Sequence, residues 1–541
     1  MYRRALRVVV VSVFFLTLGF NSQLMAQATP AAPPEAPQFT SRTQLVLVPV
    51  VVTGKGGAHV SGLGRDAFRI EEQGKPRAVT IFEEVKPEVD GTKPRVVPVL
   101  QGRSNFNYEN APSGHMTVVV LDLLNTPYLG QGDGMRRLVE YISKTLPRNE
   151  AAAVFGLGVQ GLRQLYPPTT DTEALLKALK GVPGPGRAEQ AATVSVGQSQ
   201  EIAQQAAQDY SAFVSTQGTD RREYDYLQAS WTTLVAMTQI ADAYNTVPGR
   251  KTLIWATAGF PWMAASVGIS RSTLESKYEE TWRDLNSAGF SIYSVDVSDL
   301  AGFKGSLISY GSTNRKQQTL RQFAYETGGL PCVGIGIDIE KCFVHAVADS
   351  SSYYLLGYYL PSNDMKPGWR KLKVKVEGVH GSDVRARSGF YVSGAAEETA
   401  AIRHRKLAEA LSSPVEYTGV RFNVREVPAE GKTATAGKSW HAFEVGVLGN
   451  SITVDELKGN AVELSVVAVA VGSDGKDHGH LDHQMSAKLQ PEMVAKFRKT
   501  GLSTVQPLEL APGKYDVRFA VRDNLNGEIG TVGYPLVVSN H

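Results

Sequence analysis

The fold is decided by Met116-Thr-Val-Val-Val-Leu-Asp-Leu-Leu-Asn-Thr126, an apolar run that ends in a carboxylate and two small polar residues. A strand that is apolar along its whole length is typical of a parallel sheet covered on both faces. Such a strand delivers its last polar side chains to the carboxyl edge of the sheet. The stretch therefore predicts a central strand of an open α/β sheet, with Asp122 at its edge.

The sequence after this strand alternates between strand and helix patterns. Further buried strands are expected at 152–157, 251–256 and 290–295. Helical patterns are expected at 131–146, 171–180, 224–244, 272–288 and 315–327. This alternation predicts a mostly parallel sheet with helices on both faces. Residues 183–222 are rich in Gly, Ala, Gln and Ser, and their pattern predicts no definite element.

Short strand patterns stand on both sides of this α/β region. They lie at 45–52, 67–71 and 79–82 before it, and at 353–359, 370–376 and 384–392 after it. Three short strands bury too little surface alone, so we expect the two sets to pair in one interrupted β-sandwich. Short strands from residue 417 onward predict a second, immunoglobulin-like sandwich.

The first residues are expected to be an export signal. Arg3, Arg4 and Arg7 precede an apolar stretch at 8–20, and Ala26-Gln27-Ala28 is a cleavage candidate. A stretch of this length is short for a membrane span, although a signal anchor is the alternative. We expect a periplasmic or extracellular protein that has no integral membrane span after signal removal.

The charge balance gives no reason to expect nucleic acid as a partner. Without residues 1–28 the 541-residue chain carries 53 basic and 53 acidic residues, so the basic balance belongs to the signal. With 42% apolar and 20% charged residues, the composition is that of a globular protein of about three domains.

The chain has two cysteines, Cys332 and Cys342. In an oxidising compartment we expect a disulfide between them, and two free buried thiols are the alternative. His345, the nearest histidine, completes no metal-ligand spacing with them.

The stretch at 116–126 resembles the strand that carries the metal-ion-dependent adhesion motif of von Willebrand factor type A (vWA) domains, Asp-x-Ser-x-Ser. Asp122 and Thr126 match this motif, but Leu124 stands where the first Ser is expected. The family's Thr-Asp-Gly corresponds to Thr257-Ala258-Gly259, and its second-loop Thr is absent from 181–187. The resemblance implies a Mg²⁺ site of hard oxygen ligands, of which this sequence keeps two.

We therefore expect no cofactor at this edge, with Asp122 and Asn125 holding the loop or the next helix by hydrogen bonds. The alternative is a Mg²⁺ site at Asp122 and Thr126, to which Asn125 and Asp296 add oxygen atoms.

The order of the remaining motifs resembles the vWFA-related acidobacterial domain proteins, a family of exported bacterial proteins. The motifs lie at 60–76, 248–255, 327–329 (Thr-Gly-Gly), 353–359, 367–374 and 387–391, and the resemblance covers roughly residues 44–394. It implies a vWA-like, Rossmann-like sheet inserted in a β-sandwich, and it leaves the activity open. The expected parts are a signal peptide at 1–28, a linker at 29–39, sandwich strands at 40–95, the vWA-like domain at 112–350, returning strands at 351–394, a helical connector at 395–412 and the immunoglobulin-like domain at 413–541.

The expected function is protein binding at the carboxyl edge of the parallel sheet, without a metal. The residues expected to line this edge are Asp122, Asn125, Thr126, Gly259 and Asp296. A cation-dependent adhesin and a structural component of a cell-envelope assembly are the alternatives, and the partner's identity stays open.

Two other groups of residues have a composition that could carry chemistry. Asp477-His-Gly-His-Leu-Asp-His483 has the composition of a Zn²⁺ or Cu²⁺ site, but the flanking glycines favour a solvated loop. The aromatic residues at 353–359 and 390–391 are expected to be cross-strand pairs, with a ligand platform as the alternative. No nucleophile elbow, zinc-protease helix or Walker loop is present, so we expect no enzymatic activity.

Overall fold

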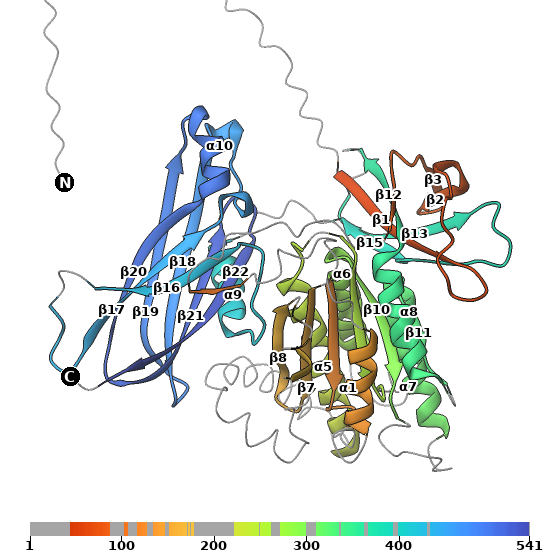
Figure 1. The fold of residues 1–541 in the computed structure, drawn as a ribbon, viewed down its shortest axis with the longest axis horizontal. Helices are drawn as coiled ribbons and strands as arrows, with labels where there is room; N and C mark the ends of the chain where they lie inside the picture. Colours follow the sequence, from red (N-terminus) through yellow and green to blue (C-terminus); the bar gives the residue numbers. More distant parts are fainter. Residues whose placement is uncertain are drawn as a thin grey trace, which may run out of the picture. The chain divides into compact units, whose positions relative to one another are not determined.

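The fold is described from a computed structural model of the chain (Figure 1). The structure describes residues 44–86, 102–105, 116–126, 134–145, 151–169, 171, 173, 175–177, 221–247, 249–260, 271–298, 310–334, 337–361, 366–392, 399–429 and 433–539. The expected signal peptide and linker, the stretch at 181–187 and nearly all of 183–222 lie outside these residues.

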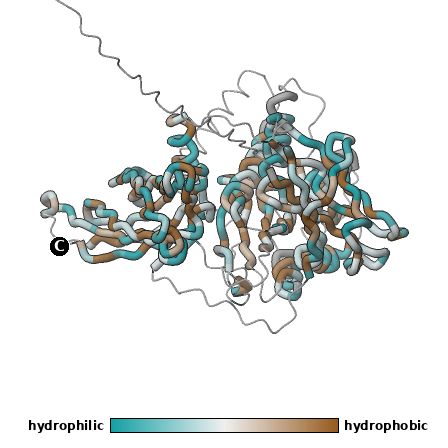
Figure 2. Tube along the Cα trace, turned by 90° about the horizontal axis from the view of Figure 1, so that it is seen from above, coloured by the Kyte–Doolittle hydropathy of each residue, from teal (hydrophilic) through white to brown (hydrophobic). Residues whose placement is uncertain are grey.

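The central element is a six-stranded sheet in the order β11-β10-β9-β6-β7-β8. Its strands are β6 (Met116–Asp122), β7 (Ala151–Gly158), β8 (Gly161–Thr169), β9 (Lys251–Thr257), β10 (Phe290–Asp296) and β11 (Leu330–Cys332). Five strands run parallel, of which β6, β7, β9 and β10 were predicted and β11 was not. Every residue of β6, β9 and β10 is buried. Figure 2 shows hydrophobic residues along these strands.

The strand β8 is a difference from the sequence prediction, which placed no strand there. It pairs antiparallel with β7 at the edge of the sheet, and it contains Pro167 and Pro168. Proline cannot donate to a ladder, and an edge strand tolerates it because one side of the strand is unpaired.

Helices cover both faces of the sheet. They are α1 (Gly134–Thr145), α5 (Arg221–Ala243), α6 (Arg271–Ser287), α7 (Tyr310–Thr327) and α8 (Ile339–Ser351). Val118 and Val120 face the core under α5, α6 and α7, whereas Val119 and Leu121 face the core under α1 and α8. The alternation follows from the two-residue period of a strand, so an unbroken apolar run fills both cores.

The interrupted sandwich consists of two four-stranded sheets, β14-β1-β12-β4 and β15-β13-β2-β3. Each sheet combines strands that precede the α/β region with strands that follow it, and Gln44 pairs with Leu360. The two sheets share one hydrophobic core. The strands are β1 (Gln44–Thr53), β2 (Phe68–Glu72), β3 (Lys75–Arg77), β4 (Ile81–Val85), β12 (Tyr353–Leu360), β13 (Gly368–Val376), β14 (Asp383–Ala386) and β15 (Gly389–Val392).

Close backbone packing joins this sandwich to the α/β region. At Gly328, whose φ is +71°, an added Cβ would lie 2.5 Å from the carbonyl carbon of Ala386. At Gly329 an added Cβ would lie 1.9 Å from the carbonyl oxygen of Ile292. The Thr-Gly-Gly motif is therefore explained by close approach of three backbone segments, which leaves no room for side chains.

A buried polar network lies at the same junction. Tyr293 of β10 donates to Asp349 of α8 over 2.7 Å, and Arg385 of β14 forms an ion pair with the same carboxylate. Arg250 donates to the Tyr293 hydroxyl over 3.0 Å and to the Gly328 carbonyl over 3.0 Å. Buried charged groups require such partners, so the network fixes these elements relative to one another.

The carboxyl-terminal region is also a pair of four-stranded sheets, β20-β17-β16-β5 and β19-β18-β21-β22, around one core. Its elements are α9 (Ala400–Ser412), β16 (Phe422–Val427), β17 (Ser439–Val447), β18 (Ala461–Gly472), β19 (Asp477–Lys488), α10 (Pro491–Thr500), β20 (Leu502–Leu510), β21 (Gly513–Asp523) and β22 (Ile529–Val538). The helix α9 matches the predicted connector, whereas α10 was not predicted.

Residues 86–113 are rich in Pro and Asn and their sequence predicts a loop, but the structure places a short strand there, β5 (Arg103–Ser104). It pairs with β16, more than 300 residues later in the chain. The next residue, Asn105, is buried and donates to the carbonyl oxygens of Tyr417 and Val420. A two-residue strand has no period to recognise, which is why the sequence pattern did not indicate it.

Within the part of the chain that the structure describes, no helix has the length and apolar character needed to cross a membrane.

The structure bonds Cys332, at the end of β11, to Cys342 in α8, with the two Cα atoms 6.1 Å apart. The expected disulfide therefore fastens the last strand of the central sheet to the helix that follows it.

We predict that replacing both cysteines, Cys332→Ala with Cys342→Ala, lowers the free energy of unfolding by about 3 kcal/mol, because the crosslink restricts the unfolded chain. Denaturant titration of the variant and of the wild type measures this loss. Dithiothreitol should destabilise the wild type by a similar amount and leave the variant unchanged. Equal stability of the two proteins would contradict the prediction.

A buried lysine begins β9. Lys251 is 1% exposed, and its ammonium donates to the carbonyl oxygens of Val247 and Gly249 and lies 5.7 Å from the centroid of the Phe290 ring. Burial lowers the pKa of Lys251 from 10.5 to about 7.

We predict that this lysine makes stability increase with pH. Between pH 7 and pH 10 the unfolded chain binds a proton at Lys251 that the folded chain has lost, so the folded state gains stability as pH rises. Melting temperatures of Lys251→Met across this range should rise less than those of the wild type. Lys341→Met, at an exposed lysine, is the control, and an identical pH slope in Lys251→Met and the wild type would refute the idea.

Candidate binding edge of the central sheet

The strand order places a topological switch point between β6 and β9. From β6 the chain passes to β7 on one side, and it returns to β9 on the other side of β6 (Figure 1). Where the connections reverse direction, the loops at the carboxyl ends of the strands part and leave a crevice. Asp122 ends β6 and Thr257 ends β9, so both lie at this point.

The carboxylate of Asp122 is fully buried and accepts four hydrogen bonds. Its Oδ1 accepts from the backbone N–H of Asn125 over 2.9 Å. Its Oδ2 accepts from the Thr257 hydroxyl over 2.6 Å, from Asn125 Nδ2 over 2.8 Å and from Trp255 Nε1 over 3.1 Å. The interpretation that Asp122 and Asn125 hold the loop by hydrogen bonds is therefore confirmed.

The neighbouring polar groups close the same network. The Thr126 hydroxyl oxygen accepts from the backbone N–H of Ala258 over 2.6 Å, and the Thr257 hydroxyl oxygen accepts from Gly259 N–H over 2.9 Å. Gly259 has a φ of +72°, and an added Cβ would lie 3.2 Å from the carbonyl oxygen of Lys316. Glycine is thus required both by the turn and by the approach of α7.

Asp296 lies at the same edge but outside this network. In the register of β10 and β9 it stands beside Thr257. Its Oδ1 accepts from the backbone N–H and the hydroxyl of Ser298, over 3.0 and 2.6 Å, and its Oδ2 accepts from Gln317 over 3.4 Å. Of the five residues predicted for the edge, the structure joins Asp122 with Asn125 directly, links Thr126 and Gly259 through the β9 turn, and leaves Asp296 separate.

These residues do not fit the Mg²⁺ site that the vWA resemblance implies. The Nε1 atom of Trp255 can only donate a hydrogen bond. Asp122 Oδ2 accepts that bond, so on this side the oxygen faces an N–H group and not a cation. Leu124, at the position of the first Ser, packs against the hydrophobic core. Magnesium needs near-octahedral oxygen ligands, whereas Asp122 already accepts four hydrogen bonds from protein donors, three of them at Oδ2.

The electrostatics of the edge involve one residue that the sequence did not indicate, Lys316 of α7. Burial lowers the pKa of Lys316, while the charges of Asp296 and Asp122 act in the opposite direction. Burial also raises the pKa of Asp122, against the hydrogen bonds from Thr257, Asn125 and Trp255. A lysine ammonium therefore belongs to the charge environment of this edge.

Trp255 and Thr233 are further contributors that sequence reasoning missed. Asn125 Nδ2 donates to the Thr233 hydroxyl of α5 over 3.0 Å, in addition to its bond with Asp122. The sequence did contain a signal for the role of Trp255. A tryptophan inside a buried strand needs an acceptor for its N–H, so a nearby acceptor could have been expected.

The histidine-rich segment at 477–483 is not the loop that was expected. It lies in β19, paired antiparallel with β18 from Asp477 to Lys488. His478 pairs with Asp474 over 2.9 Å, and His480 pairs with Asp477 over 3.4 Å. Among the described residues, no three His, Cys, Asp or Glu side chains are grouped so as to hold a metal ion.

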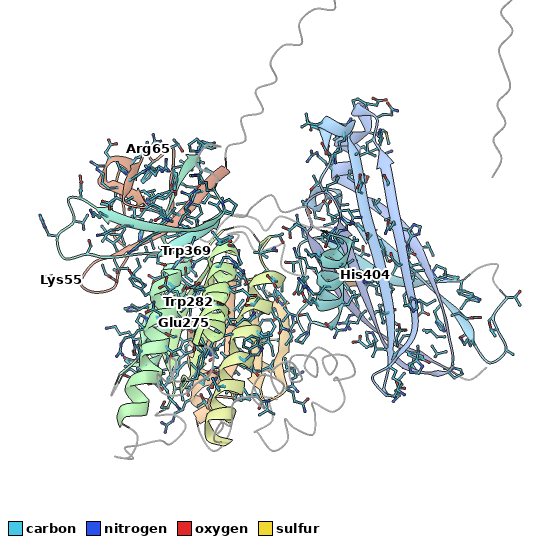
Figure 3. All side chains as sticks on the ribbon, turned by 180° about the vertical axis from the view of Figure 1, so that it is seen from behind. Lys55, Arg65, Glu275, Trp282, Trp369 and His404 are labelled. Atoms are coloured by element: carbon cyan, nitrogen blue, oxygen red, sulfur yellow. A yellow bond between two sulfur atoms is a disulfide. The ribbon has the colours of Figure 1, made fainter. Side chains whose placement is uncertain are left out.

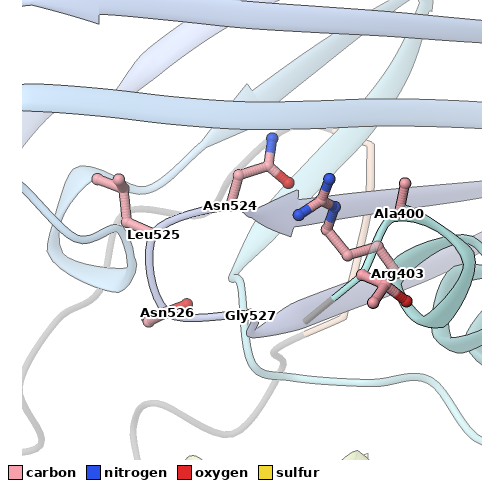
Figure 4. A pocket seen from close by; sticks show the side chains of 7 residues that line it. Ala400, Arg403, Asn524, Leu525, Asn526 and Gly527 are labelled. Atoms are coloured by element: carbon pink, nitrogen blue, oxygen red, sulfur yellow. The ribbon is translucent and has the colours of Figure 1, made fainter. Parts of the chain in front are cut away.

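A pocket of about 600 Å³ lies elsewhere, between the start of α9 and the turn that joins β21 to β22 (Figure 4). Arg403 and Asn524 are among its polar lining residues. It is separate from the edge around Asp122, since none of its lining residues belongs to the central sheet.

Comparison with known proteins adds no relative: no protein-family model matches the chain, and no curated protein matches it.

We predict that Asp122→Ala lowers the free energy of unfolding by about 3 kcal/mol, because it leaves several buried donors without an acceptor. Asp122→Asn should also lose stability, since in either orientation its amide N–H₂ faces a donor, the Asn125 backbone N–H on one side or the Thr257 and Trp255 donors on the other. Asn125→Ala, which keeps the backbone bond, should lose about 1 kcal/mol. Denaturant titration checks the series, and a stable Asp122→Asn variant would show that the carboxylate is not the acceptor described.

Proposed function

We propose that the chain is an exported protein-interaction module built on a vWA-like domain, which binds its partner across the carboxyl edge of the central sheet without a metal ion. An immunoglobulin-like domain follows the vWA-like domain. The proposal rests on one observation above all: the polar edge lies at the switch point of an open α/β sheet, and the Asp122 carboxylate there is already satisfied by protein donors.

The expected mode of recognition is direct contact with the edge loops. The strands that carry Asp122, Thr257 and Asp296 are buried along their whole length, so they offer a rigid base for the loops that follow them. Binding residues are found disproportionately on loops held by such a scaffold. The resemblance of the motifs to exported vWFA-related proteins supports the same assignment.

Of the two alternatives, one uses the same edge with a metal ion and the other uses other parts of the molecule. A cation-dependent adhesin would need Asp122 to exchange protein donors for a metal. A structural component of a cell-envelope assembly would place its contacts on the β-sandwiches and leave the edge of the central sheet unused.

Calorimetric titration with Mg²⁺, Mn²⁺ and Ca²⁺ is expected to give no saturable binding up to millimolar metal, because the Asp122 carboxylate already accepts four hydrogen bonds from protein donors. The wild type and Asp122→Ala should give the same trace. Saturable binding that disappears in Asp122→Ala would overturn metal independence and favour the cation-dependent adhesin.

A pull-down from an envelope extract tests recognition at the edge. The protein is expected to retain a partner equally with and without EDTA, and Asp296→Ala with Lys316→Ala should lose it. Lys341→Ala, at an exposed lysine of α8, is the matched control and should retain the partner. Retention by the edge variant would favour the structural role instead.

A further inference from the structure

The outward face of the sheet β15-β13-β2-β3 carries a line of aromatic and basic side chains. On β13, Leu372 is buried in the sandwich core, whereas the alternate residues face outward and are exposed. These outward residues are Trp369, Lys371, Lys373 and Lys375. Alternate residues of a strand are about 7 Å apart, so their side chains form a regular row, here called the β13 row.

Two ammonium groups of the β13 row form no ion pair with a described residue, although the hydrogen bond from Lys375 and, less strongly, the charge of Lys373 lower the pKa of the nearby Glu71 carboxylate. Lys375 is paired with Glu71 over 2.6 Å, and the nearby Arg69 is paired with Glu377 over 3.0 Å. Lys371 and Lys373 form no ion pair with any described residue, although Lys373 stands opposite Glu71 in the strand register. The row therefore presents positive charge that nothing within the described residues neutralises by direct contact.

Trp369, which is labelled in Figure 3, lies at the amino-terminal end of the row. A Cβ added at Gly389 of β15 would lie 2.5 Å from the six-membered ring of Trp369, so the indole lies directly over this glycine. Trp369 as a whole residue is 38% exposed. Tyr391 stands directly opposite Trp369 on β15, and the guanidinium of Arg283 lies 5.0 Å from the centroid of the Tyr391 ring.

We propose that the β13 row, with Tyr391, binds an anionic polysaccharide whose sugar rings carry carboxylates. The exposed indole would stack against the C–H face of a pyranose ring, and the ammonium groups of Lys371 and Lys373 would pair with carboxylates along the polymer. Binding of this polymer needs the indole and the two ammonium groups together, and all three lie along β13. This surface is distinct from the edge around Asp122, so the inference does not depend on the proposed function.

The position of Trp369 argues against an anionic membrane as the occupant. An aromatic residue that anchors a protein at a bilayer inserts among the headgroups, whereas this indole lies along the sheet over Gly389. An acidic peptide would use the lysines in the same way, but it has no flat ring for which the indole is needed. The sugar polymer is therefore the ligand that uses every feature of the row.

Affinity electrophoresis of the purified protein in gels containing alginate, a uronate polymer, tests the proposal. Alginate should retard the protein and the neutral polymer dextran should not. The double variant Lys371→Ala with Lys373→Ala, and separately Trp369→Ala, should each raise the dissociation constant about tenfold. Trp369→Tyr, which keeps a flat ring, should restore most of the binding.

The matched control is Lys496→Ala with Lys499→Ala, which removes two exposed lysines of α10 and should bind as the wild type does. Circular dichroism of each variant separates loss of binding from loss of fold. No retardation by alginate, or equal retardation of all variants, would overturn the proposal. Binding of poly-glutamate that ignores Trp369→Ala, or binding of phosphatidylglycerol vesicles that the lysine variant abolishes, would assign the row to an acidic peptide or a membrane and overturn it as well.

Discussion

The burial of one carboxylate, that of Asp122, is the constraint on which the central sheet edge depends. A fully buried carboxylate is costly unless donors surround it, and here the donors come from the following loop and from β9. These bonds fasten the two strands at the switch point to each other. Because Trp255 also fills the core beneath α6 and α7, the edge and the core are parts of one packed unit.

Much of the α/β region could be predicted from the sequence, because unbroken apolar strands and amphipathic helices have strong periods. The segments that escaped prediction have weak or contrary patterns: β8 contains two prolines, and β5 is only two residues long. The strand β19 resembled a loop because its sequence is mostly polar, and Leu481 and Met485 are its hydrophobic residues that pack against the core. At the edge, sequence reasoning found Asp122 and Asn125 but could not supply Trp255 or Lys316, which reach the site from other elements.

Several motifs that mark the chain have packing roles rather than chemical ones. Gly328 and Gly329 allow backbones to approach where the sandwich meets the α/β region, and Arg250 enters the buried network around Tyr293. Lys251, next to it, satisfies carbonyl groups at the turn before β9. A sequence motif of this kind indicates how two domains are held together. By itself it does not indicate catalysis or ligand binding.

The pairing of β1 with β12 has a consequence for how the chain is made. Gln44 and its neighbours bond to residues around Leu360, so the first sandwich stays incomplete until most of the chain has been synthesised. Closing so long a loop costs entropy before any contact compensates for it, and such non-local pairing is typical of slow folding. The α/β region, whose contacts are more local, can fold first and bring the distant strands together.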